Sequence, residues 1–233
     1  PCGTLFPYTT LFRSVPLFPL FFHPSGTLLP LLNEKPGKGK KRLSKRVAGY
    51  MKMKRPPYLS PPGKLPPFGK ILRVLKKYNL LPAIFFLKSR ADCDGALELS
   101  RENFLRDENR REAIKERIAE LAAQSPHILQ HKQLGHLENL AIGAHHSGQL
   151  PSWKILLETL MTEGYLDAVF ATSTVAAGVN FPARTIVLLN SDRFNGREFL
   201  PLTSTEFHQM TGRAGRRGKD HIGFMVVVPG KFM

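Results

Sequence analysis

The stretch LPAIFFL, residues 81–87, is a run of apolar residues interrupted by no polar side chain. A strand with one face in water alternates apolar and polar residues, whereas an unbroken run is typical of a strand buried on both faces. Such strands occur mainly in parallel sheets covered by helices on both sides. The stretch therefore predicts an α/β fold with a buried strand at 81–87.

Further apolar runs recur along the chain, with helical patterns between them. They predict four more strands, at Leu140–Ala144, Ala168–Ala171, Thr185–Leu189 and Ile222–Val228. The helical patterns predict a short helix ending near Asn79, a long helical region at Ala91–Ser125, a helix at Trp153–Glu163 opened by Pro151, and a last helix at Thr203–Ala214 capped by Ser204 or Thr205. Strands alternating with helices indicate a parallel sheet sandwiched by helices.

The N-terminal third has a different character. Residues 4–14, TLFPYTTLFRS, resemble the in-frame translation of a sequencing adapter, so we exclude residues 1–14 from fold reasoning and expect protein to have preceded them. The apolar segment Val15–Leu32 is compatible with two short strands joined by a turn at Pro24-Ser25-Gly26. Residues 33–67 are basic and proline-rich, as in an irregular linker, which would either contact phosphates or serve as a solvated connector.

The charge is distributed unevenly. The chain carries a net charge of +16, yet residues 1–80 hold 16 Lys and Arg against one acid, Glu34, and the remainder is nearly balanced. Such a basic extension favours an anionic partner such as nucleic acid. Two distant cysteines, Cys2 and Cys93, indicate no disulfide framework and a reducing cytoplasm, and no apolar run reaches the length of a membrane span. We therefore expect a cytoplasmic protein without a membrane partner.

Three segments carry candidate chemistry, and we expect them to gather on one edge of the sheet. In QMTGRAGRRG, residues 209–218, Arg213 and Arg216 are three positions apart. If the segment is helical, their side chains share a face, which suits a polyphosphate, although a solvated basic loop fits the spacing equally well. The loop ATSTVAAGVNFPA, residues 171–183, offers hydroxyl and backbone N–H donors. In GAHHSG, residues 143–148, adjacent histidines point in different directions, so we predict no metal site.

These segments together resemble a known family. ATSTVAAGVNFPA followed by QMTGRAGRRG is similar to motifs V and VI of superfamily-two helicases, and GAHHSG and the strand IFFLKSR, residues 84–90, match the superkiller-type DExH-box branch. Ser173 and Ala177 stand where DEAD-box relatives have an acid and an arginine. The resemblance covers residues 81–233 and implies the second RecA-like lobe of a helicase, residues 68–233 and truncated at the C-terminus, preceded by an inter-lobe segment and linker, residues 15–67.

The resemblance also implies roles for individual residues. ATP would lie between this lobe and a first RecA-like lobe, with Arg213 and Arg216 on the γ-phosphate and Arg216 as the arginine finger; an arginine finger typically accelerates phosphoryl transfer about 10³- to 10⁵-fold. The other implied ATP-binding residues are Gln209, Gly178 and Asn180. The implied contacts to the nucleic-acid backbone are Ser89, Arg90, His146, Gly148, Thr172 and Thr174. Arg217 is expected to be a surface charge.

The chain has neither a G-x-x-x-x-G-K-[ST] loop nor a DExH box. We therefore expect the Mg²⁺ ligands on an absent first lobe, and a fragment that alone neither hydrolyses ATP nor unwinds a duplex. The predicted function is that of an ATP-dependent RNA helicase that translocates along a single strand. Two alternatives remain open, a DNA-repair helicase of the same superfamily and a non-catalytic nucleic-acid-binding scaffold.

Overall fold

The fold is built on a seven-stranded, mostly parallel sheet, seen in a computed structural model that describes residues 15–229 except 34–41, 62, 103–104, 174–180, 190–191 and 195–198. The strands in spatial order are β2 (Thr27–Pro30), β1 (Leu17–His23), β11 (Gly223–Val227), β8 (Thr185–Leu188), β5 (Ala83–Leu87), β7 (Ala168–Thr172) and β6 (Ile142–His145). All neighbouring pairs are parallel except β1 with β2. The α/β RecA-like class expected from the sequence is confirmed.

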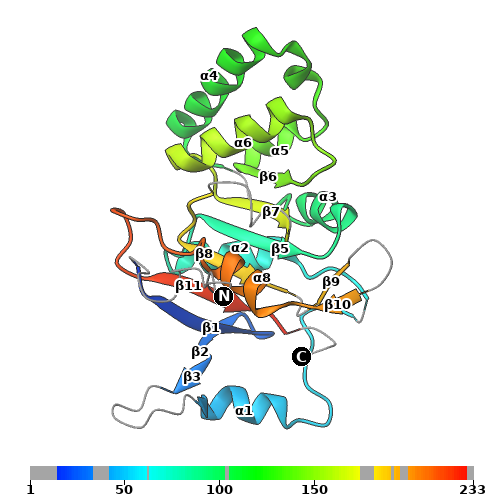
Figure 1. The fold of residues 1–233 in the computed structure, drawn as a ribbon, viewed down its shortest axis with the longest axis vertical. Coiled ribbons are helices and arrows are strands. Elements are labelled where there is room, and N and C mark those ends of the chain that lie inside the picture. The colour runs from blue at the N-terminus through cyan, green and yellow to red at the C-terminus, as the bar shows by residue number, and fades with distance from the viewer. Residues whose placement is uncertain are drawn as a thin grey trace, which may run out of the picture.

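Helices cover both faces of this sheet. On one face, the buried side chains of β5, β7 and β8 pack against α4 (Glu108–Gln124), α6 (Pro151–Glu163) and α8 (Ser204–Thr211). On the other face they pack against α2 (Phe68–Lys77) and α3 (Arg90–Glu98). All five residues of β5 and all five of β7 are buried, as the unbroken apolar runs predict. Figure 1 shows α4, α5 (Leu134–Leu140) and α6 gathered beyond β6, at the opposite end of the molecule from α1 (Lys45–Met51).

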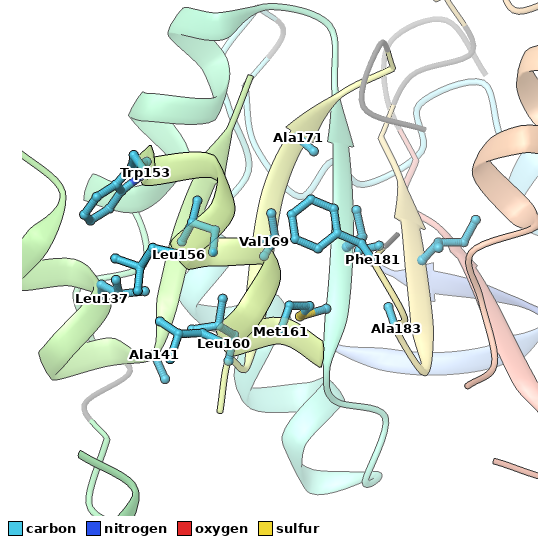
Figure 2. Packing of buried hydrophobic residues seen from close by; sticks show 14 of the residues in the cluster. Leu137, Ala141, Trp153, Leu156, Leu160, Met161, Val169, Ala171, Phe181 and Ala183 are labelled. Carbon is cyan, nitrogen blue, oxygen red and sulfur yellow. The ribbon is translucent and has the colours of Figure 1, made fainter. Parts of the chain in front are cut away.

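Figure 2 shows the core between α6 and the sheet, where Leu156 and Leu160 of the helix lie beside Val169 of β7. Trp153 at the start of the same helix is fully buried, and the ring of His131 stacks on it with a centroid distance of 3.7 Å. On the opposite face, Phe68, Phe85 and Phe170 form an aromatic cluster with ring centroids 5.0–5.7 Å apart. The apolar pattern thus fixes which side of each element is inside the core.

The segment Val15–Leu32 forms the expected hairpin. β1 pairs with β2 around the turn at residues 24–26, where Gly26 has a φ of +87°. β1 also pairs in parallel with β11, so the hairpin is part of the same sheet as the residues that follow Phe68. Buried Phe21 of β1 packs against Val47 and Tyr50 of α1.

The described part of the segment 33–67 is less irregular than its composition suggests. β3 (Leu32–Asn33) pairs with β4 (Arg42–Leu43), and α1 follows with Ser44 as its N-cap. The hydroxyl of Tyr50 donates a hydrogen bond of 2.8 Å to the carbonyl of Pro57, which ties the proline-rich stretch to the helix. The linker is therefore anchored to the sheet through one short helix.

The prediction of one long helical region at Ala91–Ser125 is wrong, because two helices occupy it. α3 ends at Glu98, and α4 begins at Glu108 with Asp107 as N-cap, its side chain accepting a hydrogen bond from the backbone N–H of Arg110. Between them the backbone N–H of Leu105 donates to the carbonyl of Asn139 in α5. That contact takes the Leu105 N–H out of any helical ladder, and the amphipathic pattern does not reveal it.

The last helix is also shorter than predicted. α8 ends at Thr211, and its N-cap is Thr203, which forms a capping box with Glu206, whereas Ser204 or Thr205 was expected. The helix does not include Arg213 or Arg216, so the segment is not helical there and the condition under which the two side chains would share a helix face is not met. The patterns also missed the 3₁₀ helix η1 (Pro126–Gln130), α5, and the hairpin of β9 (Asp192–Phe194) and β10 (Phe199–Pro201).

Candidate nucleotide and nucleic-acid sites

The first group of predicted site residues follows the carboxyl ends of β5, β7 and β6. In the sheet register, Leu87 of β5 pairs with Thr172 of β7, and Ala171 pairs with His145 of β6, so these three strand ends are level. Ser89 follows β5 and caps α3 by accepting a hydrogen bond of 3.1 Å from the backbone N–H of Asp92. Because the strands are adjacent and parallel, the polar residues after them share one edge.

Arg90, His146 and Gly148 are brought together at this edge. Arg90 is exposed, and its Cδ lies 3.4 Å from the place where a Cβ on Gly148 would be. The same position is 3.1 Å from Nδ1 of His146. A Cβ at residue 148 would be tight against the His146 ring and in ordinary contact with Arg90, so the Arg90 side chain lies close to the turn after β6.

The His146 imidazole is directed into the protein. It is 4% exposed, its Nδ1 accepts a hydrogen bond of 3.2 Å from the backbone N–H of Gly148, and its Nε2 lies 3.3 Å from Oδ1 of Asp94. The side chain of Gln149 lies between His146 and His131, at 3.1 and 2.8 Å. These contacts fix the turn at residues 146–149 relative to α3.

Asp94 holds this network together. Its two oxygens accept hydrogen bonds from Lys132 at 2.8 Å and Gln133 at 2.7 Å, and Gln133 in turn accepts from the backbone N–H of Ala144 in β6. Burial alone would raise the pKa of the Asp94 carboxyl, but hydrogen bonds from Lys132 and His146 outweigh it and lower the pKa. The sequence contains no pattern that reveals this network, because the partners of Asp94 lie 38 to 52 positions away from it and come from separate elements.

His145, the neighbour of His146, faces the opposite side of the sheet. Its Nε2 lies 3.1 Å from Oε1 of Glu158 in α6, and its ring meets Phe181 edge-on at 4.8 Å. Burial lowers the pKa of His145, although Glu158 acts in the other direction. The two adjacent histidines diverge, as expected for consecutive strand residues. Among the residues that the structure describes, no group of three His, Cys, Asp or Glu side chains could hold a metal ion.

The second group of predicted site residues lies on the loop after α8. Ala214 forms a parallel bridge with Ala183, through hydrogen bonds from Ala183 N–H to the carbonyl of Arg213 and from Gly215 N–H to the carbonyl of Ala183. Gly215 has a φ of +85°, and a Cβ there would lie 2.5 Å from Cγ1 of Val15 and 3.1 Å from Cα of Gly223. The loop is therefore pressed against the sheet beside the amino ends of β8 and β11.

Arg216 is held by a nearby carboxylate. Its Nε and Nη2 donate to Oδ2 and Oδ1 of Asp220 at 2.8 and 3.0 Å, and its backbone N–H donates to Oδ2 at 2.9 Å. The Asp220 side chain is 2% exposed, and Nε of Arg184 lies 3.9 Å from its Oδ1. Burial alone would raise the pKa of Asp220, but the hydrogen bonds from Arg216 and the charges of Arg216 and Arg184 outweigh it and lower the pKa.

Arg213 and Gln209 have different environments. Arg213 is half-buried, and burial lowers the pKa of its guanidinium. Gln209 is exposed in the second turn of α8, and Arg217 is exposed, as a surface charge should be. Gly178, Asn180 and Thr174 lie outside the described residues.

The two groups of predicted site residues lie at opposite edges of the sheet, one where the strands end and the other where they begin. The sequence did not predict this separation. Ser89, Arg90, His146, Gly148 and Thr172 follow carboxyl ends of strands, whereas the arginine loop lies by the amino ends of β8 and β11. The reason is topological: α8 runs back along the sheet, so the segment that leaves it reaches the edge where β11 begins. The expectation that all three motif segments gather on one edge is therefore wrong.

A parallel sheet with helices on both faces, carrying these motif segments at its edges, defines a RecA-like helicase lobe. The chain is 42% identical over 182 residues to the probable helicase HelY of Mycobacterium tuberculosis, an alignment that covers 75% of this chain and 19% of the relative. It is 37% identical over 163 residues to the human exosome RNA helicase MTR4, covering 68% and 16% of the two chains. With the chloroplastic DExH-box ATP-dependent RNA helicase DExH15 of Arabidopsis thaliana, the identity is 38% over 170 residues, covering 72% and 14%.

The chain belongs to the superkiller-type DExH-box helicases. It spans about a fifth or less of the length of these three relatives. No protein-family model matches the chain. None of the helices in the described part of the chain has the length and apolar character needed to cross a membrane.

Proposed function

We propose that this chain is the second motor lobe of an ATP-dependent RNA helicase that translocates along a single strand. The observation that carries this proposal is the separation of two polar surfaces on one rigid sheet. A motor must hold nucleotide and nucleic acid at the same time, and the lobe offers the arginine loop at one edge and the polar strand ends at the other. The names of the relatives, which include RNA helicases, support RNA as the strand.

The arginine loop is suited to the nucleotide. Arg213 and Arg216 lie on a segment fixed by backbone hydrogen bonds to Ala183, so two guanidinium groups are presented with little freedom of the backbone. A guanidinium is permanently charged and matches phosphate oxygens with its planar fork. We assign Arg213 and Arg216 to the γ-phosphate of ATP, and Gln209, Gly178 and Asn180 to the surrounding nucleotide site. The Mg²⁺ ligands are assigned to the first lobe.

The carboxyl edge is suited to a nucleic-acid backbone. Arg90 offers an exposed charge, Ser89 precedes it as the N-cap of α3, and Gly148 lies beside it in the turn after β6, where the lack of a side chain admits close approach of a phosphate. Thr172 would extend this surface at the end of β7, and Thr174, which lies outside the described residues, is assigned to it from the sequence motif. We propose that His146 contributes by fixing the turn, since its ring is buried and bonded to Asp94 and to the backbone of Gly148.

ATP hydrolysis tests the proposal. The 233-residue chain alone is expected to show no steady ATP turnover, because the phosphate-binding loop and the DExH box belong to the first lobe. In the full-length enzyme, Arg216→Ala is expected to lower kcat by about 10³-fold or more, the range typical of an arginine finger. Turnover by the isolated chain that disappears in Arg216→Ala would contradict the assignment of half a nucleotide site to this chain.

Competition between RNA and DNA oligonucleotides tests which nucleic acid the enzyme uses. RNA and DNA single strands of the same sequence should compete for the full-length enzyme, with RNA the stronger stimulator of ATP hydrolysis. Arg90→Gln should weaken binding of the strand without changing the KM for ATP, whereas Arg217→Gln, an exposed charge on the other edge, serves as the matched control. Equal stimulation by RNA and DNA would favour the DNA-repair alternative, and an inactive full-length enzyme would favour the scaffold.

A further inference from the structure

The carboxylate of Asp220 occupies an unusual place in a site built to attract phosphate. A negative charge beside Arg216 opposes the binding of an anion, yet the Asp220 side chain is 2% exposed and accepts three hydrogen bonds from Arg216. A buried carboxylate is costly unless it is paired and hydrogen-bonded, so the surrounding structure is arranged to keep it. Its position four residues after Arg216 closes a tight turn, in which the backbone N–H of Asp220 donates to the carbonyl of Arg216.

The contact is directional as well as electrostatic. A guanidinium has five N–H donors, and Asp220 uses two of them, one on Nε and one on Nη2. A side-by-side pair of this kind fixes the plane of the guanidinium, which a single contact would not. Three N–H donors are not used by Asp220, and the Arg216 side chain keeps 19% of its surface exposed.

We propose that Asp220 is a positioning residue for Arg216, which holds the guanidinium in one orientation and leaves its remaining donors for the γ-phosphate of ATP. The inference rests on the proposed function, because it requires Arg216 to contact that phosphate. Arg184 supports the arrangement from the other side: its Nε is buried without a hydrogen-bond partner among the described residues and lies 3.9 Å from Oδ1 of Asp220. Asp220 thus lies between two guanidinium groups and is kept ionised at neutral pH.

If Asp220 positions Arg216, its removal should lower kcat without raising the KM for ATP. Without the carboxylate, Arg216 keeps its charge but loses its fixed plane, so attraction of ATP is maintained or increased while alignment in the transition state is lost. The alternative is a latch, in which Asp220 withholds Arg216 from the nucleotide until it is released. Removing a latch would raise kcat, so the two mechanisms predict changes of opposite sign.

The experiment compares Asp220→Asn with the unmodified full-length enzyme in steady-state ATP hydrolysis. We expect kcat to fall about 10- to 100-fold, since a misplacement of about 1 Å typically costs about 100-fold, with an unchanged or lower KM for ATP. Asp167→Asn is the matched control, because Asp167 forms a similar partly buried pair with Arg110, at 2.9 Å, next to β7 and outside the arginine loop. Its kcat and KM should not change.

Two further measurements keep the test decisive. The Nε–H of Arg216 in the 233-residue chain should give a protected NMR signal that Asp220→Asn removes and Arg184→Gln does not. If Asp220→Asn does not fold, Asp220→Glu, which retains the charge on a longer side chain, should fold and recover part of kcat. An equal kcat in Asp220→Asn and the unmodified enzyme, or a higher one, overturns the inference. If Arg216→Ala itself leaves kcat unchanged, the proposed function of the loop fails as well.

Discussion

The substitution Gly215→Ala should displace the arginine loop, and the structure gives its magnitude. Gly215 has a φ of +85°, a conformation that costs a residue with a Cβ about 1–2 kcal/mol. The added methyl would also lie 2.5 Å from Cγ1 and 2.9 Å from Cβ of Val15, and 3.1 Å from Cα of Gly223. Rotation of the Val15 side chain would move its Cγ1 but not its Cβ, and the backbone of Gly223 in β11 cannot move without disturbing the sheet. Overpacking of this kind typically costs about 1–3 kcal/mol more.

Gly218 is the matched control, on the same loop. It has a φ of +75°, but no atom lies within 4 Å of the place where its Cβ would be. Gly218→Ala should therefore cost only the conformational part, about 1–2 kcal/mol, and Gly215→Ala about 2–5 kcal/mol in total. The difference between the two isolates the steric contact of the loop with Val15 and Gly223.

Chemical denaturation of the 233-residue chain measures both free energies of unfolding. Thermal unfolding should give the same order, with the midpoint falling about 2–4 °C for each kcal/mol in a protein of this size. Equal losses in Gly215→Ala and Gly218→Ala would refute the argument, because the loop would then not be packed against the sheet as described.

Three further perturbations test other parts of the molecule. Thr203→Ala should lower the free energy of unfolding by about 1 kcal/mol through loss of the capping box of α8, as denaturation would show, whereas a neutral result would mean that the cap is not formed. Because burial lowers the pKa of His145, protonation favours the unfolded chain, and the free energy of unfolding should fall as pH drops below about 6.5. His145→Gln should flatten this fall. A pH profile that is the same in the variant would contradict the assignment of the fall to His145. Replacing the exposed Lys45 and Arg46 of α1 by Gln should weaken the binding of single-stranded RNA. The slope of log K against log salt should fall by about 0.7 for each phosphate that the chain no longer neutralises. Complete loss of binding would instead place the RNA site on the basic linker. Arg111→Gln, in an ion pair with Glu108 on α4, should leave that slope unchanged.

The strands of the fold were predictable because a strand buried on both faces appears in the sequence as an unbroken run of apolar residues. Residues 81–87 contain no polar side chain, and the structure buries every residue of β5. The hairpin of β1 and β2 was predictable from its turn, since Gly26 supplies the positive φ that the turn requires. Helix boundaries were less predictable, because a distant partner decided them: the backbone N–H of Leu105 bonds to Asn139 and not within a helix.

The candidate site was predictable in its residue types and not in its arrangement. The sequence singled out Arg213 and Arg216 and the small, hydroxyl-rich loop before Phe181. It gave no indication that His146 is bonded to Asp94, 52 positions away, since only the packing of α3 beside β6 brings them together. It also extended the last helix to Ala214, whereas α8 ends at Thr211 and a bridge between Ala183 and Ala214 sets the loop.

By itself, the sequence determined the α/β class and the helicase family, because both depend on local order: unbroken apolar runs between helical patterns, and short motifs in a fixed succession. The tertiary structure decided that the arginine loop and the polar residues at the strand ends lie at opposite edges of the sheet, and that Asp220 is hydrogen-bonded to Arg216. These features depend on the direction in which α8 crosses the sheet and on the turn between Arg216 and Asp220. The direction of α8 arises from packing among segments distant in the chain, and therefore no local pattern encodes it, whereas the pair of Arg216 and Asp220 is a contact across four residues that the motif alone did not single out.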